Sequence, residues 1–381
     1  MKTFSIAVPA VNRPETLVHC LRTLLNQPGD DFEILVSDDQ GPPENRQVVE
    51  SLARPDLIRY LRTPQRLGMR GNYEFCVENS RGQYVTILGD DDGLCVGALK
   101  GARELLQGGQ PDVLFWFPHL YWWPNALVKH KQWMLYIYAN PKAAARVNAG
   151  DFLKEFFEKG WNPWLFERLP SIYNGFVSQR LLARIKQRTG RFFSDEIPDV
   201  YSGIANALMA QSAVFVERLL TIRGLSGKSY GVAFRNKKAG AALREDFKRH
   251  MTDPMCEPEL IDSTALAVHI ASVKLRARRC FAELSQAPVR IPDVITGILA
   301  ELNEDDDRFD DLVADARALA IKHGIPADSL KIPTRATGEK RKAPGIVSQR
   351  GERVVIALNG EPLAVEDIYR ASQCVYSILG D

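Results

Sequence analysis

Short apolar runs alternate with helix-like segments through the first third of the chain. After the first run, apolar residues recur at three- or four-residue intervals, as at Leu17, Leu21 and Leu24, which is typical of one helical face. Because strands that alternate with helices form parallel sheets, we expect a doubly wound, mostly parallel α/β fold. The runs that predict its strands lie at 4–10, 32–36, 57–61, 83–88 and 112–117.

The pattern changes after residue 117. Aromatic residues are frequent between 121 and 138, where we expect antiparallel strands or a loop layer over the sheet edge. Beyond about residue 240 the alternation ends, and an amphipathic helix is expected over 264–285, with basic residues beside its apolar stripe. We expect this helix to pack against the preceding domain, and contact with a membrane surface or with a second copy is the alternative.

These changes divide the chain into successive segments. The stretch that we expect to be a linker is rich in Pro, Gly, Lys and Arg. The segments are an α/β domain over 1–235 with halves 1–117 and 118–235, a mainly helical extension over 236–330, a linker over 331–350, and a terminal strand and helix over 351–381.

Composition and charge exclude several classes of protein. Hydrophobic residues make up 45% of the chain, which is ordinary for a globular protein, and a net charge of +2 does not favour nucleic acid. The six cysteines include no C-x-x-C pair, so neither a zinc site nor a disulfide framework is indicated. The first residues predict a strand rather than a signal peptide, and no apolar run reaches the roughly 18 residues of a membrane span. We therefore expect a cytoplasmic protein, with peripheral attachment to the inner face of the membrane as an alternative.

Acidic residues follow two of the predicted strands. Asp38 and Asp39 come after the second strand, and Asp90, Asp91 and Asp92 come after the fourth. Open α/β sheets bind ligands at the carboxyl ends of their strands. Three adjacent carboxylates repel one another, and a hard divalent cation with oxygen ligands would offset that repulsion. A solvated acidic turn is the alternative, but acids at two strand ends favour a shared binding site.

Two later segments carry further candidate chemistry. Asp199 stands at or near the start of a predicted helix, where capping alone would explain an acid. The segment 224–231 contains Gly, Lys and Ser, but Ile222 occupies a position where a phosphate-binding P-loop needs glycine. We therefore read that segment as a flexible loop, with Lys228 as a minor candidate for a phosphate contact.

The first half of the chain resembles family 2 of the inverting glycosyltransferases, which have the GT-A fold. The matching segments are 5–17, 34–40, 66–72 and 82–92, in that order. The resemblance is strong to about residue 117, looser to about residue 230, and absent beyond. It implies a GT-A-like α/β domain whose first half binds a nucleotide sugar.

The resemblance also implies partners and binding residues. It implies a nucleotide-diphosphate sugar donor, an acceptor hydroxyl on a glycan or another molecule, and a divalent cation, Mn²⁺ or Mg²⁺. Assembly of glycans or surface polysaccharides is the role expected from the family. The family's nucleotide-sugar-binding positions correspond here to Pro9, Asn12, Arg13, Asp38, Asp39, Arg70 and Asp90.

The family's Asp-x-Asp motif implies the metal ligands. In its Leu-Asp-x-Asp-Asp form, Asp91 and Asp92 match the last two acids, and Gly89 replaces the first. The resemblance therefore makes Asp91 the preferred metal ligand, with Asp92 as its support.

The family's general base usually lies in an acidic pair just before a helix. Asp199 fits that position best, and Asp195 and Glu196 are its rivals. Which of these three carboxylates is the base stays open at this point.

Elementary chemistry agrees with a metal-dependent, inverting glycosyl transfer. A metal held by carboxylates stabilises the leaving diphosphate, and a carboxylate base activates the acceptor hydroxyl. One alternative is a sugar- or nucleotide-binding module without catalysis, which the missing acid at Gly89 supports. A sugar nucleotidyltransferase is a weaker alternative, because the loop from Pro9 to Arg13 lacks the glycines that it would need.

Overall fold

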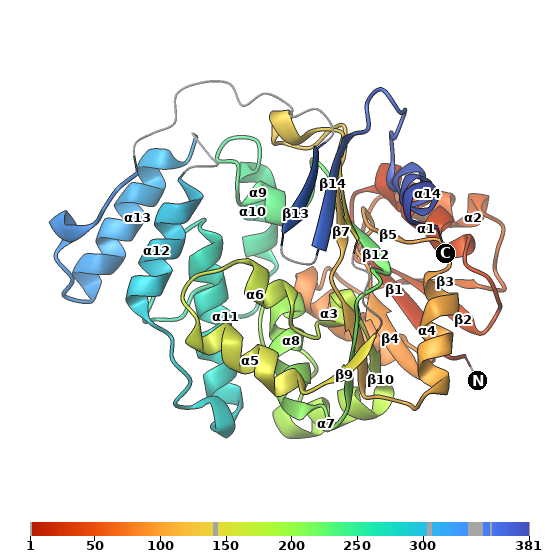
Figure 1. The fold of residues 1–381 in the computed structure, drawn as a ribbon, viewed down its shortest axis with the longest axis horizontal. Helices are drawn as coiled ribbons and strands as arrows, with labels where there is room; N and C mark the ends of the chain where they lie inside the picture. The colour runs from red at the N-terminus through yellow and green to blue at the C-terminus, as the bar shows by residue number, and fades with distance from the viewer. Residues whose placement is uncertain (1, 140–143, 303–306, 334–345, 351–352, 381) are drawn as a thin grey trace.

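Two sheets organise the molecule (Figure 1). The computed structural model describes residues 2–139, 144–302, 307–333, 346–350 and 353–380. The larger sheet has eight strands in the order β3 (Ile58–Arg62), β2 (Phe32–Asp38), β1 (Phe4–Ala10), β4 (Tyr84–Ile87), β10 (Gly175–Ser178), β6 (Val113–Trp116), β11 (Ala213–Val216) and β9 (Ala145–Val147).

The first four strands of this sheet are parallel. Ala10 of β1 lies opposite Asp38 of β2, and Ala7 of β1 lies opposite Ile87 of β4. Asp38 and Asp39 at the end of β2 and the acids that follow β4 therefore lie at the same edge of the sheet. Strand β10 runs antiparallel between β4 and β6, and β6 pairs in parallel with β11.

Helices cover both faces of the larger sheet. On β1, Phe4, Ile6 and Val8 join one buried cluster, and Ala7 joins the other, because successive side chains of a strand point to opposite faces. The first cluster includes α1 (Pro14–Leu25) and α4 (Ala98–Gln107), with α2 (Pro43–Ser51) packed beside it. The second cluster includes α3 (Gly68–Asn79), α5 (Ala149–Glu158), α6 (Trp164–Glu167), α7 (Gln179–Thr189) and α8 (Pro198–Met209), with the short η2 (Ile172–Asn174).

The second sheet contains the aromatic segment. Strand β7 pairs antiparallel with β8, so the expectation of antiparallel strands, rather than of a loop layer, is confirmed. Strand β12 pairs with β7 and with β5, which directly follows the acidic triplet. The order is β13 (Ile346–Arg350), β14 (Arg353–Asn359), β8 (Met134–Ala139), β7 (His119–Trp122), β12 (Thr221–Leu225) and β5 (Gly93–Leu94), with the turn η1 (Lys129–Lys131) between β7 and β8.

The C-terminal segment returns to the first half of the chain. Helix α14 (Ile368–Leu379) packs against α1, β5 and β12, and it lies beside α1 in Figure 1. The expected terminal strand and helix thus correspond to β14 and α14. Within the expected linker, residues 346–350 form β13, and 334–345 lie outside the described residues.

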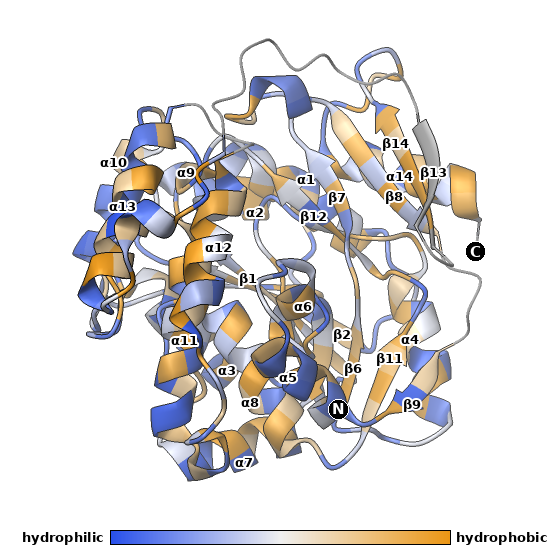
Figure 2. Cartoon of the chain, turned by 60° about the vertical axis from the view of Figure 1, so that its left-hand side comes forward, coloured by the Kyte–Doolittle hydropathy of each residue, from blue (hydrophilic) through white to orange (hydrophobic). Residues whose placement is uncertain are grey.

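The helical extension has a core of its own. Helices α11 (Leu266–Cys280), α12 (Ile291–Glu301) and α13 (Phe309–Lys322) share one buried cluster, and α11 also packs on α8. Figure 2 shows hydrophobic and hydrophilic turns alternating along these helices. The smaller helices of this region are α9 (Tyr230–Ala233), α10 (Ala241–Arg249), η3 (Ala282–Leu284) and η4 (Ala327–Ser329).

The apolar stripe of α11 is buried. Val268, Ile270 and Val273 lie in the clusters that join α11 to α12 and to α8. This stripe therefore packs within the chain, as expected first. None of the helices in the described ranges has both the length and the apolar character needed to cross a membrane.

The predicted fold class is confirmed. The structure has a doubly wound, mostly parallel α/β sheet and a mainly helical region towards the C-terminus. Its main departure is the antiparallel strand β10 in the centre of the larger sheet.

Candidate active site

The acidic triplet forms a buried turn between β4 and β5. The exposed fractions of Asp90, Asp91 and Asp92 are 1%, 3% and 1%. The alternative of a solvated acidic turn is therefore wrong. Burying three adjacent carboxylates is unfavourable unless cations or hydrogen-bond donors compensate them, so their partners define the site.

Arg13 reaches both of the first two acids of the triplet. It precedes α1, and its guanidinium forms an ion pair with Oδ1 of Asp90. Its Nη1 also lies 2.8 Å from Oδ2 of Asp91. Burial alone would lower the pKa of Arg13, but Asp90 and Asp91 raise it above its usual value. The planar guanidinium can meet two carboxylates at once because its donors form a fixed fork.

The second and third acids are tied to the segment at β12. The Ser226 hydroxyl donates to Oδ2 of Asp91 at 2.7 Å. The Gly224 N–H donates to Oδ1 of Asp92 at 2.6 Å, and the Tyr173 hydroxyl donates to Oδ2 of Asp92. Both oxygens of Asp92 are thus used within the protein, whereas Oδ2 of Asp90 accepts no hydrogen bond from any described residue.

Gly89 is required by the close packing of this turn. Its N–H donates to Oδ2 of Asp92 at 3.0 Å. A Cβ atom at this position would lie 2.7 Å from the Tyr173 hydroxyl and 2.8 Å from Oδ2 of Asp92. A side chain at position 89 would therefore require Tyr173 or Asp92 to shift.

Burial changes the protonation of the triplet. It raises the pKa of Asp90 to about 7, with Arg13 opposing this shift and Asp91 adding to it. Burial also raises the pKa of Asp92 to about 7, and the charge of Asp91 adds to that shift. The triplet therefore favours cations, because a bound positive charge stabilises the ionised forms.

Asp199 lies in the first turn of α8, close to the triplet's partners. The N-cap residue of α8 is Ile197, so Asp199 is the second residue of the helix rather than its cap. Burial raises the pKa of Asp199, and the positive charge of Arg223 opposes this shift. A carboxylate with a raised pKa is a stronger proton acceptor, which suits a general base.

Arg223 of β12 connects Asp199 with the triplet. Its guanidinium forms an ion pair with Glu167 and lies 5.4 Å from the ring centre of Tyr173. Its charge also acts on Asp92 and on Asp199. Sequence reasoning missed Arg223 and Tyr173, since one lies in an apolar strand segment and the other among core aromatics. An arginine within an otherwise apolar strand was the available signal for the first.

Asp195 and Glu196 face the helical extension instead. Asp195 accepts a hydrogen bond from the Ile197 N–H at 2.8 Å, and its carboxylate lies 3.6 Å from Nε of Arg276 on α11. Glu196 accepts the backbone N–H groups of Thr252 and Asp253, both at 3.1 Å. Burial raises the pKa of Asp195 to about 7, with Arg276 opposing the shift. Asp195 and Glu196 therefore form contacts that hold the helical extension to the α/β domain.

Arg70 is engaged in the same attachment. It forms an ion pair with Asp253, and its Nε lies 3.5 Å from Glu196. Arg70, expected at a nucleotide-sugar-binding position, thus has its guanidinium paired with residues of the extension and with Glu196.

The acids after β2 organise neighbouring loops. Asp38 accepts the Gly41 N–H at 2.7 Å and forms an ion pair with Arg62 at 2.9 Å. Asp39 accepts the N–H groups of Leu67 and Gly68, at 2.7 and 3.0 Å, where α3 begins. Negative charge is favourable at a helix N-terminus, so Asp39 stabilises the start of α3. Both acids are buried.

The first loop meets the loop after β12. Pro9 lies in β1 opposite Ser37. Nζ of Lys228 donates to the backbone oxygen of Asn12 at 2.8 Å and lies 2.8 Å from Glu15. The structure thus brings Lys228 to the loop that carries Asn12 and Arg13.

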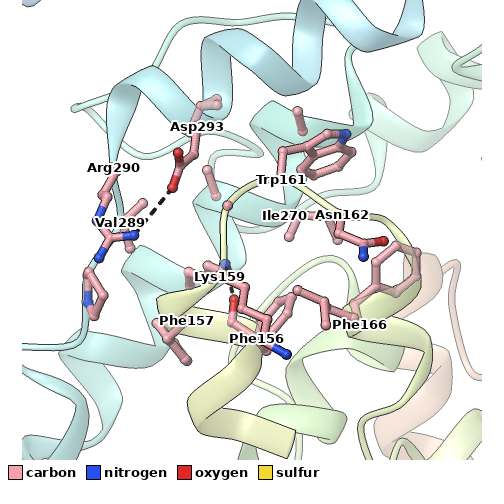
Figure 3. A pocket seen from close by; sticks show the side chains of 17 residues that line it. Phe156, Phe157, Lys159, Trp161, Asn162, Phe166, Ile270, Val289, Arg290 and Asp293 are labelled. Atoms are coloured by element: carbon pink, nitrogen blue, oxygen red, sulfur yellow. Dashed lines mark hydrogen bonds and ion pairs between the residues drawn. The ribbon is translucent and has the colours of Figure 1, made fainter.

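A separate cavity lies between the α/β domain and the extension (Figure 3). Its volume is about 40 Å³, and α5, α6, α11 and α12 contribute to its lining. Nζ of Lys274 donates to the Phe156 backbone oxygen at 2.5 Å and lies 4.1 Å from the centre of that ring. Burial lowers the pKa of Lys274 to about 8. The lining contains no residue of the triplet and neither Arg13 nor Asp199, so this cavity is distinct from the candidate active site.

Comparisons with known proteins match mainly the first half of the chain. Residues 5–158 match the family described as Glycosyl transferase family 2. A GalNAc(5)-diNAcBac-PP-undecaprenol beta-1,3-glucosyltransferase of Campylobacter jejuni is 37% identical over 115 residues, which cover 30% of this chain and 37% of that protein. The uncharacterized protein MT1568 of Mycobacterium tuberculosis is 36% identical over 96 residues, or 25% of this chain and 30% of that protein. This chain thus spans about a third of the length of these curated relatives.

Solved structures match over a longer range at low identity. The crystal structure of S. aureus TarS 1–349 in complex with UDP-GlcNAc superposes with a TM-score of 0.46 and 16% identity, covering 86% of this chain and 89% of that chain.

Proposed function

We propose that this chain, whose residues 5–158 match glycosyl transferase family 2, transfers a sugar from a nucleotide-diphosphate sugar to an acceptor hydroxyl. The observation that carries the proposal is the buried pair Asp90 and Asp91 at the carboxyl end of β4, faced by Arg13. This is the edge at which open α/β sheets bind ligands. The name of the Campylobacter jejuni relative, which describes glucosyl transfer to an undecaprenol-linked glycan, supports a glycan acceptor.

The residues of the triplet fit a divalent cation, Mn²⁺ or Mg²⁺. Oδ2 of Asp90 is buried without a hydrogen-bond donor among the described residues, and carboxylate oxygens are the ligands that these cations prefer. This oxygen supports Asp90, rather than Asp92, as the partner of Asp91. No group of three or more His, Cys, Asp or Glu in the described ranges is arranged to hold a metal ion by itself. The proposed site therefore uses two carboxylates, and the donor's phosphates and water complete the coordination of the cation.

The proposed mechanism is a single displacement with inversion. Asp199 accepts the proton of the acceptor hydroxyl while the oxygen of that hydroxyl attacks the anomeric carbon of the donor sugar. The bond from that carbon to the diphosphate breaks at the same time, on the opposite face of the sugar. When bound, the metal supplies charge stabilisation to the leaving diphosphate. The raised pKa of Asp199 supports its role, and the contacts of Asp195 and Glu196 with the extension argue against theirs.

The proposal is tested by separating donor binding from transfer. Asp199→Asn should lower the transfer rate by roughly a hundred- to ten-thousand-fold, because general base assistance is lost, and should retain donor binding. Asp91→Asn should lose metal-dependent donor binding. A panel of UDP-, GDP-, CDP- and dTDP-sugars with Mn²⁺, measured by calorimetry and by product formation, provides both readouts.

The exposed Asp56→Asn variant is the control, since this carboxylate lies in a surface ion pair with Arg54 and should affect neither readout. Unchanged transfer in Asp199→Asn would exclude it as the base. Loss of donor binding in the same variant would also count against that role.

A binding module without catalysis is the second candidate. Gly89 in place of the family's first acid, and Arg13 between the two acids of the proposed metal site, favour it. Donor binding without turnover across the whole panel would support this candidate over the transferase.

A further inference from the structure

Arg13 occupies the position where positive charge would be expected from a bound metal. Its guanidinium contacts Asp90 and Asp91, the two carboxylates assigned to the metal under the proposed function. Its side chain is 15% exposed, and those of Asp90 and Asp91 are 1% and 4% exposed. Among the described residues, no other cation forms an ion pair with either acid.

Arg13 and a bound metal would compete most directly at Asp91. Oδ2 of Asp91 already has Nη1 of Arg13 at 2.8 Å and the Ser226 hydroxyl at 2.7 Å. A divalent ion bound to this carboxylate would lie next to a guanidinium of the same sign, in a buried site where charges interact strongly. A guanidinium is always protonated at physiological pH, so it cannot relieve the repulsion by losing a proton.

We propose that Arg13 is a built-in counter-cation that competes with the divalent metal for Asp90 and Asp91. In the donor-free protein it neutralises the buried acids, and the metal gains full access to them only when the guanidinium moves away. Arg13 lies in the loop before α1, so its side chain can move without displacing a strand or helix. The diphosphate of a donor offers an alternative partner, because guanidinium groups bind phosphate oxygens in a bidentate manner.

This inference rests on the proposed metal site, and metal binding to the donor-free protein tests it. Free and bound Mn²⁺ are measured by electron paramagnetic resonance in the wild type, Arg13→Gln and Arg13→Lys. Arg13→Gln should bind Mn²⁺ at least about tenfold more tightly than the wild type, because the competing charge is gone. Arg13→Lys should show a smaller gain, since lysine keeps the charge but cannot fork between two carboxylates.

Arg46→Gln is the matched control. Arg46 forms an ion pair with Glu50 at 2.8 Å on the exposed surface of α2, and its loss should leave Mn²⁺ affinity unchanged. Circular dichroism checks that each variant is folded. Equal or weaker Mn²⁺ binding in Arg13→Gln overturns the proposal. If that variant does not fold, the absence of any gain in Arg13→Lys overturns it.

The failure of this inference can be distinguished from failure of the proposed function. Electron paramagnetic resonance measures Mn²⁺ binding whether or not any sugar is transferred. A wild type that transfers no sugar, but whose Arg13→Gln variant gains affinity for Mn²⁺, would contradict the transferase and support the competition.

Discussion

Replacement of Arg223 by methionine is the perturbation that most directly tests the network beside the triplet. Arg223 forms an ion pair with Glu167, and the two side chains are 18% and 13% exposed. Removing one partner of a buried ion pair typically costs about 3–5 kcal/mol, because the remaining charge is left without compensation. Glu167 keeps some access to water, so we expect a loss of about 3 kcal/mol in the free energy of unfolding.

The assay is a double-mutant cycle in urea, with unfolding followed by tryptophan fluorescence. Glu167→Gln and Arg223→Met are measured alone and together, and the loss in the double variant should be smaller than the sum of the single losses. Arg188→Met is the control, since the exposed Arg188–Glu283 pair should contribute at most about 1 kcal/mol. A coupling energy below about 0.5 kcal/mol between Arg223 and Glu167 would refute the reasoning.

The same variant should change the pH dependence of transfer. Burial raises the pKa of Asp199, Arg223 lowers it, and the charge of Glu167 raises it. A general base is active when deprotonated, so activity falls as pH drops through its pKa. Without Arg223 the pKa of Asp199 rises further, and the acidic limb of the pH–rate profile should move to higher pH. An unchanged limb, or one at lower pH, would contradict the assignment of Asp199.

Two further predictions concern stability. Burial lowers the pKa of His269 in the folded protein to about 4, so on acidification the unfolded state binds a proton before the folded state does. The contribution of neutral His269 to the free energy of unfolding should therefore be complete above about pH 6.5 and be lost as pH falls towards 4. His269→Gln should weaken this pH dependence of the free energy of unfolding, measured by urea titrations at several pH values. Gly89→Ala should destabilise the protein by roughly 1–3 kcal/mol, because the added Cβ collides with the Tyr173 hydroxyl and Oδ2 of Asp92. Gly101→Ala in α4 is the control: its Cβ would have no atom within 4 Å, so it should be neutral or stabilising. Equal unfolding midpoints for both variants would contradict the steric argument.

The alternation of strands and helices could be predicted from the sequence because it depends on local periodicity. Apolar runs and helical spacing predicted β1 to β4, β6 and the helices between them. The acids after β2 and β4 were found for the same reason, since they directly follow apolar strands. Strand β10 was not predicted as part of the larger sheet, because its position between β4 and β6 depends on pairing with residues distant in sequence.

The roles of the candidate site residues also depend on contacts with residues distant in sequence. From the sequence, Asp199 fitted the position of the general base best, but Asp195 and Glu196, within four positions of it, stayed as rivals. The structure separates them because α8 begins at Pro198 and because Arg276 of α11 approaches only the first of the three. A similar separation applies to Asp90 and Asp92, of which only the second has both oxygens engaged.

By itself the sequence determined the fold class, the strand-end acids and the resemblance that gives them a chemical meaning. These features depend on residues near one another in the chain. Only the tertiary structure decided how the acids are neutralised: Arg13 reaches across to Asp90 and Asp91, and the Gly224 N–H, 132 positions after Asp92, binds that carboxylate. Ion pairs and hydrogen bonds act over a few ångströms, so their partners are set by the packing of distant segments, which local pattern does not encode.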